Sequence, residues 1–279
     1  MFQYAAGRAL STKLRQDLLL DVSDFSDYSL HNGYELSRVF NVHAEFADTK
    51  LVRELLGWKA ARTVRRVLNR PSVAWLRGRK YVVEPHFHYW PDFFQRTDDC
   101  YLTGYWQSER YFSSVSDLLR QEFMFREPLT GKNQEIAAEI STSQSISLHV
   151  RRGDYVSNPK TRQVIGPCSE IYYQNAIKYV TERVERPRFY VFSDDPAWVK
   201  QNIQVPLPCI YVEHNVKSES YRDMQLMSLC HHHIIANSSF SWWGAWLNSR
   251  PGKIVVAPRE WFAKPVNTSD LIPPAWCQL

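Results

Sequence analysis

The sequence predicts an α/β fold built on a parallel sheet. From about residue 133 onward, short apolar runs typical of buried strands alternate with stretches of helical periodicity. Several of these runs end in charged or polar residues, as strands do at the ligand-binding edge of such sheets. The composition, 44% hydrophobic and 23% charged, is typical of a globular chain and excludes a disordered one.

The N-terminal part begins with a helix. Residues 1–14 (MFQYAAGRALSTKL) have small residues at helical spacing, and residues 17–21 (DLLLD) predict a short buried strand that ends in Asp21. A helix that precedes the first strand is unusual, because an α/β fold normally starts with a strand and a glycine-rich turn.

A basic segment follows at residues 47–80, where leucines and valines at roughly helical spacing are interspersed with arginines and lysines. We favour a solvated helix face for it. The functional alternative is peripheral contact with an anionic membrane or a lipid-phosphate acceptor. The net charge of +5 is too small to indicate nucleic-acid binding, and no apolar run is long enough to span a bilayer.

Residues 84–112 are rich in aromatic side chains and are predicted to be mostly loop. His86 and His88 alternate with aromatics and would share one side of a strand, but no third ligand accompanies them, so no metal site is expected. Residues 104–112 predict a strand that turns into a helix. A helix and a polar break then follow, which predicts a domain boundary near 130, with domains 1–130 and 131–279.

The C-terminal part has a regular alternation, with Ser169 as the expected N-cap of one helix and Pro196 in the first turn of the next. The predicted helices are 134–140, 168–183, a helix after Pro196, 220–230 and 241–248, and the predicted strands are 146–150, 188–195, 209–214, 232–236 and 253–258. This order predicts a parallel sheet with helices on both faces.

Three of these strand ends carry candidate binding groups. They are HVRRGDY (149–155), FSDD (192–195) and NSSF (237–240). Arginine forks suit phosphate oxygens, serines with a helix N-terminus can hold an anion, and an acid can bind a base or a ribose. Together the three ends predict a nucleotide-diphosphate pocket.

Each motif alone has a structural interpretation. Arg-Gly-Asp-Tyr could form an ordinary turn, and the acids of FSDD could cap a helix. Trp242 and Trp243 are expected in the core. The histidines at 231–233 would point alternately on a strand and are expected to be structural.

HVRRGDY, GYWQSERYF, FSDD, NSSFSWWGAWLN and the opening MFQYAAGRAL together resemble the α-1,2-fucosyltransferase family, glycosyltransferase family 11 with its HxRRxD motif. The resemblance covers nearly the whole chain. It implies a GT-B-like fold, in which two Rossmann-like domains face a cleft and the C-terminal one holds the donor. It also implies metal-independent, inverting transfer of L-fucose from GDP-β-L-fucose to the 2-hydroxyl of a galactose in a glycan. No other cofactor is expected.

The resemblance also implies roles for single residues. Arg151 would contact the β-phosphate with help from Arg152, and His149 would line the donor pocket. Asp194, with Asp195 close behind, would bind guanine or ribose. Ser238 and Ser239, with the N-terminus of the helix that follows and Phe240, would contribute N–H groups to the phosphates. Asp154 is either the general base or a residue that orients the arginines; Glu109 is a further candidate for the base.

The chain departs from the family pattern at its start. The family usually begins with a strand and a Gly-Gly-Leu-Gly-Asn-Gln turn just before Met-Phe-Gln-Tyr-Ala, whereas this sequence starts at Met1. We expect weak or no activity if that first strand and loop are truly absent. The open alternatives are another GDP-fucose-dependent transferase (of the α-1,6 or protein O-fucosyl type) and a non-catalytic nucleotide- or glycan-binding homologue. The family resemblance suggests a cytoplasmic bacterial enzyme of surface polysaccharide (O-antigen) synthesis.

Overall fold

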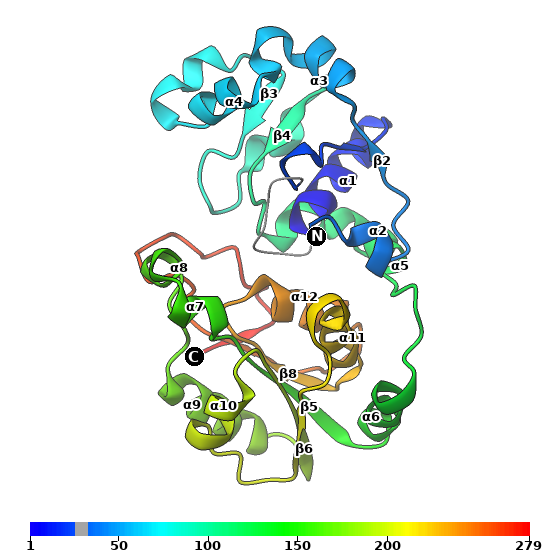
Figure 1. The fold of residues 1–279 in the computed structure, drawn as a ribbon, viewed down its shortest axis with the longest axis vertical. Coiled ribbons are helices and arrows are strands. Elements are labelled where there is room, and N and C mark those ends of the chain that lie inside the picture. The colour runs from blue at the N-terminus through cyan, green and yellow to red at the C-terminus, as the bar shows by residue number, and fades with distance from the viewer. Residues whose placement is uncertain (26–32) are drawn as a thin grey trace. The chain divides into compact units, whose positions relative to one another are not determined.

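The computed structural model describes residues 1–25 and 33–279 (Figure 1). Their contacts group into two compact units. The first comprises Met1–Arg126 with Asn267–Pro273, and the second comprises Glu127–Val266 with Pro274–Leu279. Within the described residues, no helix combines the length and the apolar character needed to cross a bilayer.

The first unit contains short elements. Its helices are α1 (Phe2–Leu14), α2 (Leu36–Val39), α3 (Thr49–Leu56), α4 (Arg62–Leu68) and α5 (Ser116–Glu122), and its strands are β1 (Leu19–Leu20), β2 (Glu45–Phe46), β3 (Tyr81–Val83) and β4 (Tyr101–Thr103). The strands form two separate parallel pairs, β1 with β2 and β3 with β4. The predicted first helix is confirmed. A strand does precede Asp21, but it comprises only Leu19 and Leu20, and the prediction that it is buried is wrong, because Leu19 is exposed and Leu20 is half-buried.

Two predictions for the first unit are wrong. The strand predicted within 104–112 ends before it, at Thr103, and short 3-10 turns follow instead of a helix. His86 and His88 lie outside any strand; their rings stack on each other with centroids 3.5 Å apart. Three-residue strands such as β3 are too short to leave a clear alternation in an aromatic-rich sequence.

The second unit contains one six-stranded sheet in the order β10-β9-β8-β5-β6-β7, with every pair parallel. Its strands are β5 (Gln144–Val150), β6 (Pro187–Ser193), β7 (Cys209–Val212), β8 (His232–Ile234), β9 (Val255–Ala257) and β10 (Cys277–Gln278). Its helices are α6 (Gly131–Ser141), α7 (Gly153–Ser157), α8 (Pro159–Val164), α9 (Glu170–Thr181), α10 (Pro196–Asn202), α11 (Tyr221–Leu229) and α12 (Ser239–Leu247). The predicted α/β fold with a parallel sheet is confirmed.

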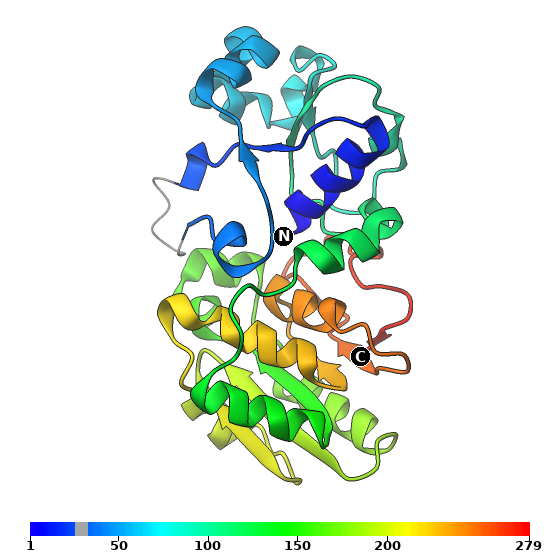
Figure 2. The same cartoon turned by 90° about the vertical axis from the view of Figure 1, so that its right-hand side faces the viewer.

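Helices cover both faces of this sheet. Figure 1 shows α9 and α10 on one side and α6 and α11 on the other, and Figure 2 shows α6 and α11 side by side in front of the strands. Ile146 and Leu148 of β5 pack in the α9 core, whereas Tyr190 and Phe192 of β6 pack in the α6–α11 core. Burial of both faces explains the continuous apolar run of β6.

The strand order reverses between β5 and β8. Successive strands β5, β6 and β7 extend to one side, and β8, β9 and β10 extend to the other. In open α/β sheets, ligands bind at the carboxyl ends of the strands that flank such a switch point. The segments that follow β5 and β8 are therefore the first place to search for a site.

The predicted structural roles of the histidines and tryptophans are confirmed. His233 is buried, and its Nδ1 lies 2.8 Å from the Ser147 hydroxyl while its Nε2 lies 2.8 Å from Nδ2 of Asn248. Trp242 and Trp243 are buried in α12.

Candidate active site

Arg151 follows β5 directly and is held between two carboxylates. Its Nη2 donates to Asp154 Oδ1 at 2.7 Å, and its Nη1 lies 3.0 Å from Asp194 Oδ2. The guanidinium therefore has a fixed orientation, while its side chain stays 32% exposed. A positioned and accessible arginine fork can receive an oxyanion without reorganisation.

Gly153 makes this arrangement possible. A Cβ added at that position would lie 2.5 Å from Asp194 Oδ2, closer than real Cβ contacts allow. Asp194 also accepts a hydrogen bond from the Arg152 backbone N–H, at 2.8 Å. Asp194, at the end of β6, thus ties the segment after β5 to the neighbouring strand. Its Oδ1 accepts the hydrogen bond from Arg152, and its Oδ2 forms the ion pair with Arg151.

Arg152 is packed differently. Its guanidinium stacks on Trp198, 3.6 Å from the ring centroid, and its Nε donates to Asp195 Oδ2 at 3.4 Å. Asp195 also caps α10, since its Oδ1 accepts from the Trp198 backbone N–H at 3.3 Å. The helix-cap interpretation of FSDD is thus correct for Asp195, which holds Arg152 as well.

His149, near the end of β5, is 6% exposed, and its ring lies 5.8 Å from that of Phe240. Burial, aided by the nearby Arg151 charge, lowers the pKa of His149 to about 3, so the imidazole is neutral at physiological pH. Within the described residues its Nδ1 is buried without a hydrogen-bond partner. Such an atom is a candidate contact for a ligand.

The segment after β8 forms the start of α12. The Ser238 side chain caps this helix by accepting from the Phe240 backbone N–H at 3.3 Å. Ser238 is buried, and Ser239 is exposed in the first helical position. The first N–H groups of a helix lack intrahelical partners and carry the positive end of its dipole, which suits an anion.

Tyr155 connects the two strand ends. Its hydroxyl donates to the Asn237 carbonyl at 3.1 Å, and its ring lies 5.7 Å from the Arg151 guanidinium. Asn237 is buried and donates from Nδ2 to the carbonyls of Gly166, at 2.7 Å, and Trp261, at 3.1 Å. Asn237 therefore holds surrounding loops in place.

The structure thus brings most of the predicted residues to one edge of the sheet. One network of ion pairs, linked by the hydrogen bond from the Arg152 backbone N–H to Asp194, joins Arg151, Arg152, Asp154, Asp194 and Asp195. Glu109 lies in the first unit, at the start of a 3-10 turn. Within residues 1–25 and 33–279, no group of three or more His, Cys, Asp or Glu side chains is arranged to hold a metal ion.

Asp223 is a residue that the sequence did not single out. It lies in the first turn of α11 and accepts from Asn215 Nδ2 at 2.8 Å, where Asn215 follows β7 at the same edge of the sheet. Burial raises the pKa of Asp223 to about 7. Perturbed carboxyl groups are common at functional sites, but only the folded structure reveals this burial.

The chain is similar to known glycosyltransferases. The profile described as Glycosyl transferase family 11 matches residues 91–279. An alpha-1,2-colitosyltransferase and the O-antigen biosynthesis glycosyltransferase WbnK, both from Escherichia coli, are each 34% identical over 100% of this chain, which spans 94% and 96% of those proteins. The human galactoside alpha-(1,2)-fucosyltransferase 1 is 26% identical over 52% of this chain and 42% of its own length.

The residues that match the family include the whole sheet edge built by β5, β6 and β8. The similarity to the colitosyltransferase covers the whole chain and so includes the first unit as well. The chain belongs to glycosyl transferase family 11.

Proposed function

We propose that this protein is an inverting α-1,2-fucosyltransferase that moves L-fucose from GDP-β-L-fucose to the 2-hydroxyl of a galactose in a glycan, in bacterial O-antigen synthesis. The observation that supports it most is Arg151, fixed by Asp154 and Asp194 at the switch point of the sheet. A GT-B arrangement, with the donor held by the second unit, is part of the proposal.

In this mechanism the acceptor hydroxyl attacks the anomeric carbon of fucose as the bond to the GDP oxygen breaks. Negative charge then grows on the β-phosphate. Arg151 would neutralise it through its fork, and N–H groups at the start of α12, such as that of Ser239, would donate to the same diphosphate. The Phe240 N–H is held by the Ser238 side chain, which fixes this end of the helix. These donors are in place before the reaction, so they stabilise the transition state without a cost in reorganisation. We propose no metal or other cofactor in this step.

The nucleoside would occupy the neighbouring part of the edge. The buried His149 Nδ1, which lacks a partner in the described residues, is suited to accept or donate one hydrogen bond to it. Contact of Asp194 and Asp195 with guanine or ribose remains a prediction. Their ion pairs with Arg151 and Arg152 support a second role, in which the two acids position the arginines.

The general base stays open between two candidates. Asp154 accepts a hydrogen bond from Arg151 at 2.7 Å, which supports the alternative role for Asp154, that of orienting the arginine. Glu109 would have to act from the first unit.

GDP-colitose is a second candidate donor, and one observation supports it. A colitosyltransferase is 34% identical over the whole chain, whereas the human α-1,2-fucosyltransferase matches only 52% of it. Colitose lacks the 3-hydroxyl of L-fucose, so the two donors differ by one hydrogen-bonding group. The acceptor linkage would be the same.

Parallel reactions with GDP-fucose and GDP-colitose on a panel of β-galactosides test the proposal, with the product linkage read by NMR. We expect an α-1,2 product with GDP-fucose as the better donor. Preference for GDP-colitose would move the assignment to the second candidate. An α-1,6 linkage, or GDP binding without transfer to any acceptor, would contradict the proposal.

A further inference from the structure

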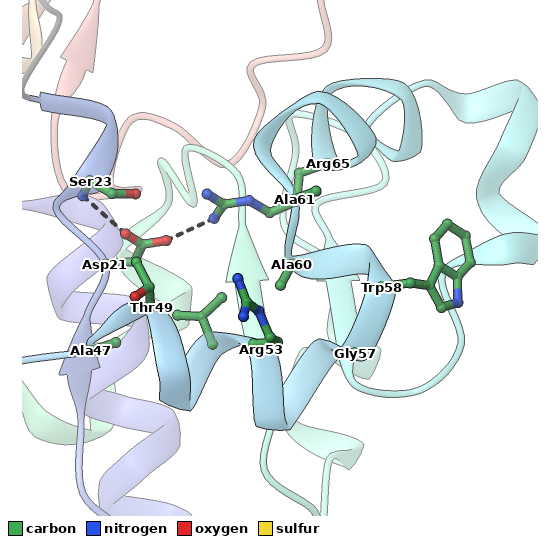
Figure 3. A pocket seen from close by; sticks show the side chains of 11 residues that line it. Asp21, Ser23, Ala47, Thr49, Arg53, Gly57, Trp58, Ala60, Ala61 and Arg65 are labelled. Carbon is green, nitrogen blue, oxygen red and sulfur yellow. Dashed lines mark hydrogen bonds and ion pairs between the residues drawn. The ribbon is translucent and has the colours of Figure 1, made fainter.

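The first unit contains a pocket of about 400 Å³ at the ends of β1 and β2 (Figure 3). Asp21 follows β1, Ala47 follows β2, and Arg53 and Arg65 come from α3 and α4. The lining also includes two hydroxyl side chains and several small residues, namely Ser23, Thr49, Gly57, Ala60 and Ala61. None of these groups takes part in the donor site proposed above.

Asp21 and Arg65 form a nearly buried ion pair at one side of the pocket. Nη1 of Arg65 lies 2.7 Å from Asp21 Oδ2, and the two side chains are 11% and 12% exposed. Asp21 also accepts from the Tyr101 hydroxyl at 2.6 Å and from the Ser23 backbone N–H at 3.0 Å. Although burial opposes ionisation, these hydrogen bonds lower the pKa of Asp21 to about 2. The Asp21 carboxylate is therefore ionised, and its oxygens already accept hydrogen bonds from Arg65, Tyr101 and Ser23.

The hydrogen-bond donors of the two arginines that line the pocket have fewer partners than the Asp21 carboxylate has. Among the described residues, the contacts of Arg65 with Asp21 and Tyr101 use only Nη1, and the side chain of Arg53 forms no ion pair or hydrogen bond. In Figure 3, Arg53 extends from α3 toward the part of the pocket where Arg65 and Asp21 meet. Two guanidinium groups and one carboxylate leave a positive charge there, and an anion would relieve the repulsion between the arginines.

The surrounding segment adds to this charge. Residues 50–80 contain ten lysines and arginines and one glutamate, whereas the whole chain has 34 basic and 29 acidic residues. The remainder of the chain is therefore net acidic. A basic region around a donor-rich pocket attracts and retains anions.

We propose that this pocket binds an anionic group, a phosphate or a carboxylate, of the acceptor. Binding of an anion follows from the charges of the pocket; its assignment to the acceptor rests on the proposed transferase function. Both groups present two oxygens to an arginine fork, so they share one recognition chemistry.

The test compares Arg53→Ala with Arg66→Ala. Arg66 is likewise an exposed arginine, on the neighbouring helix α4, and it does not line the pocket. Calorimetry with inorganic pyrophosphate and with glucuronate, each in the presence of saturating GDP to fill the donor site, measures binding directly. We expect Arg53→Ala to weaken binding of at least one of these anions about 10- to 100-fold, and Arg66→Ala to leave it nearly unchanged. The preferred anion identifies phosphate or carboxylate.

Equal losses in both variants, or unchanged binding in Arg53→Ala, would overturn the proposal, as would the absence of binding in the unmodified protein. A second readout tests the assignment to the acceptor. With GDP-fucose, Arg53→Ala should raise KM for a phosphorylated or uronate-bearing galactoside and leave kcat for a neutral one unchanged. Failure of the proposed function would abolish this readout in every variant but leave the calorimetric result intact, so the two failures are distinguishable.

Discussion

Replacement of Arg151 by alanine tests the centre of the proposed site. The change removes the guanidinium that lies between Asp154 and Asp194, at 2.7 and 3.0 Å. Removal of one preorganised donor to a developing oxyanion typically costs about 10²–10³ in kcat. We expect a loss of at least this size, because the change also leaves two carboxylates facing the leaving diphosphate without their cation.

The fold should survive the same change. The three side chains are 32%, 41% and 24% exposed, and partly exposed ion pairs contribute only about 0–1 kcal/mol each. Since about 1 kcal/mol shifts the melting temperature of a domain of this size by about 2–4 °C, we expect a shift of a few degrees at most. A large loss of activity would therefore not be an effect of unfolding.

The assay is the initial rate of fucosyl transfer to a β-galactoside, together with a thermal melt. Arg188→Ala is a matched control, because Arg188 pairs with Glu139 at 2.7 Å at the opposite end of β6 and has similar exposure. Arg151→Lys should also be poor, since one ammonium cannot reproduce a fork held by two separate nitrogens. A near-normal rate in Arg151→Ala, with the control equally active, would refute the reasoning.

Three further predictions concern the neighbouring carboxylates and the turn. Asp194→Asn, which removes one of the two ionic partners of Arg151, should lower kcat/KM about 10- to 100-fold, and unchanged kinetics would show that this contact does not position the arginine. Gly153→Ala should reduce transfer while circular dichroism stays unchanged, because its Cβ would meet Asp194 Oδ2 at 2.5 Å; full activity would contradict this close approach. Asp223 has a pKa of about 7 in the folded protein, above its usual value near 4, so the folded state binds more protons between these pH values and loses stability as pH rises through them. Asp223→Asn should therefore raise the melting temperature more at pH 8 than at pH 5, and a pH-independent difference would argue against the buried carboxyl.

The sequence by itself determined the α/β class of the second unit and the positions of its main strands. In β5, apolar residues alternate with polar ones, and β6 contains the continuous apolar run of residues 189–192; both strands are long and buried, so their signal is strong. The residues that follow them were also predictable, because polar groups at the ends of parallel strands gather at one edge. The short pairs β1–β2 and β3–β4, and the edge strand β10, carry too few residues for such a signal.

Only the tertiary structure decided how these residues act on one another. Asp194 lies 43 positions after Arg151 in the chain, and their ion pair depends on the pairing of β5 with β6 and on the missing side chain of Gly153. The pKa of Asp223 likewise depends on the folded structure, because burial raises it. Arg53 and Arg65 cannot be told apart from the other arginines of the basic segment by composition, and only the structure shows that they line one pocket. Local sequence determines which groups are available, whereas distance and burial, which depend on the packing of remote segments, determine their charge and chemistry.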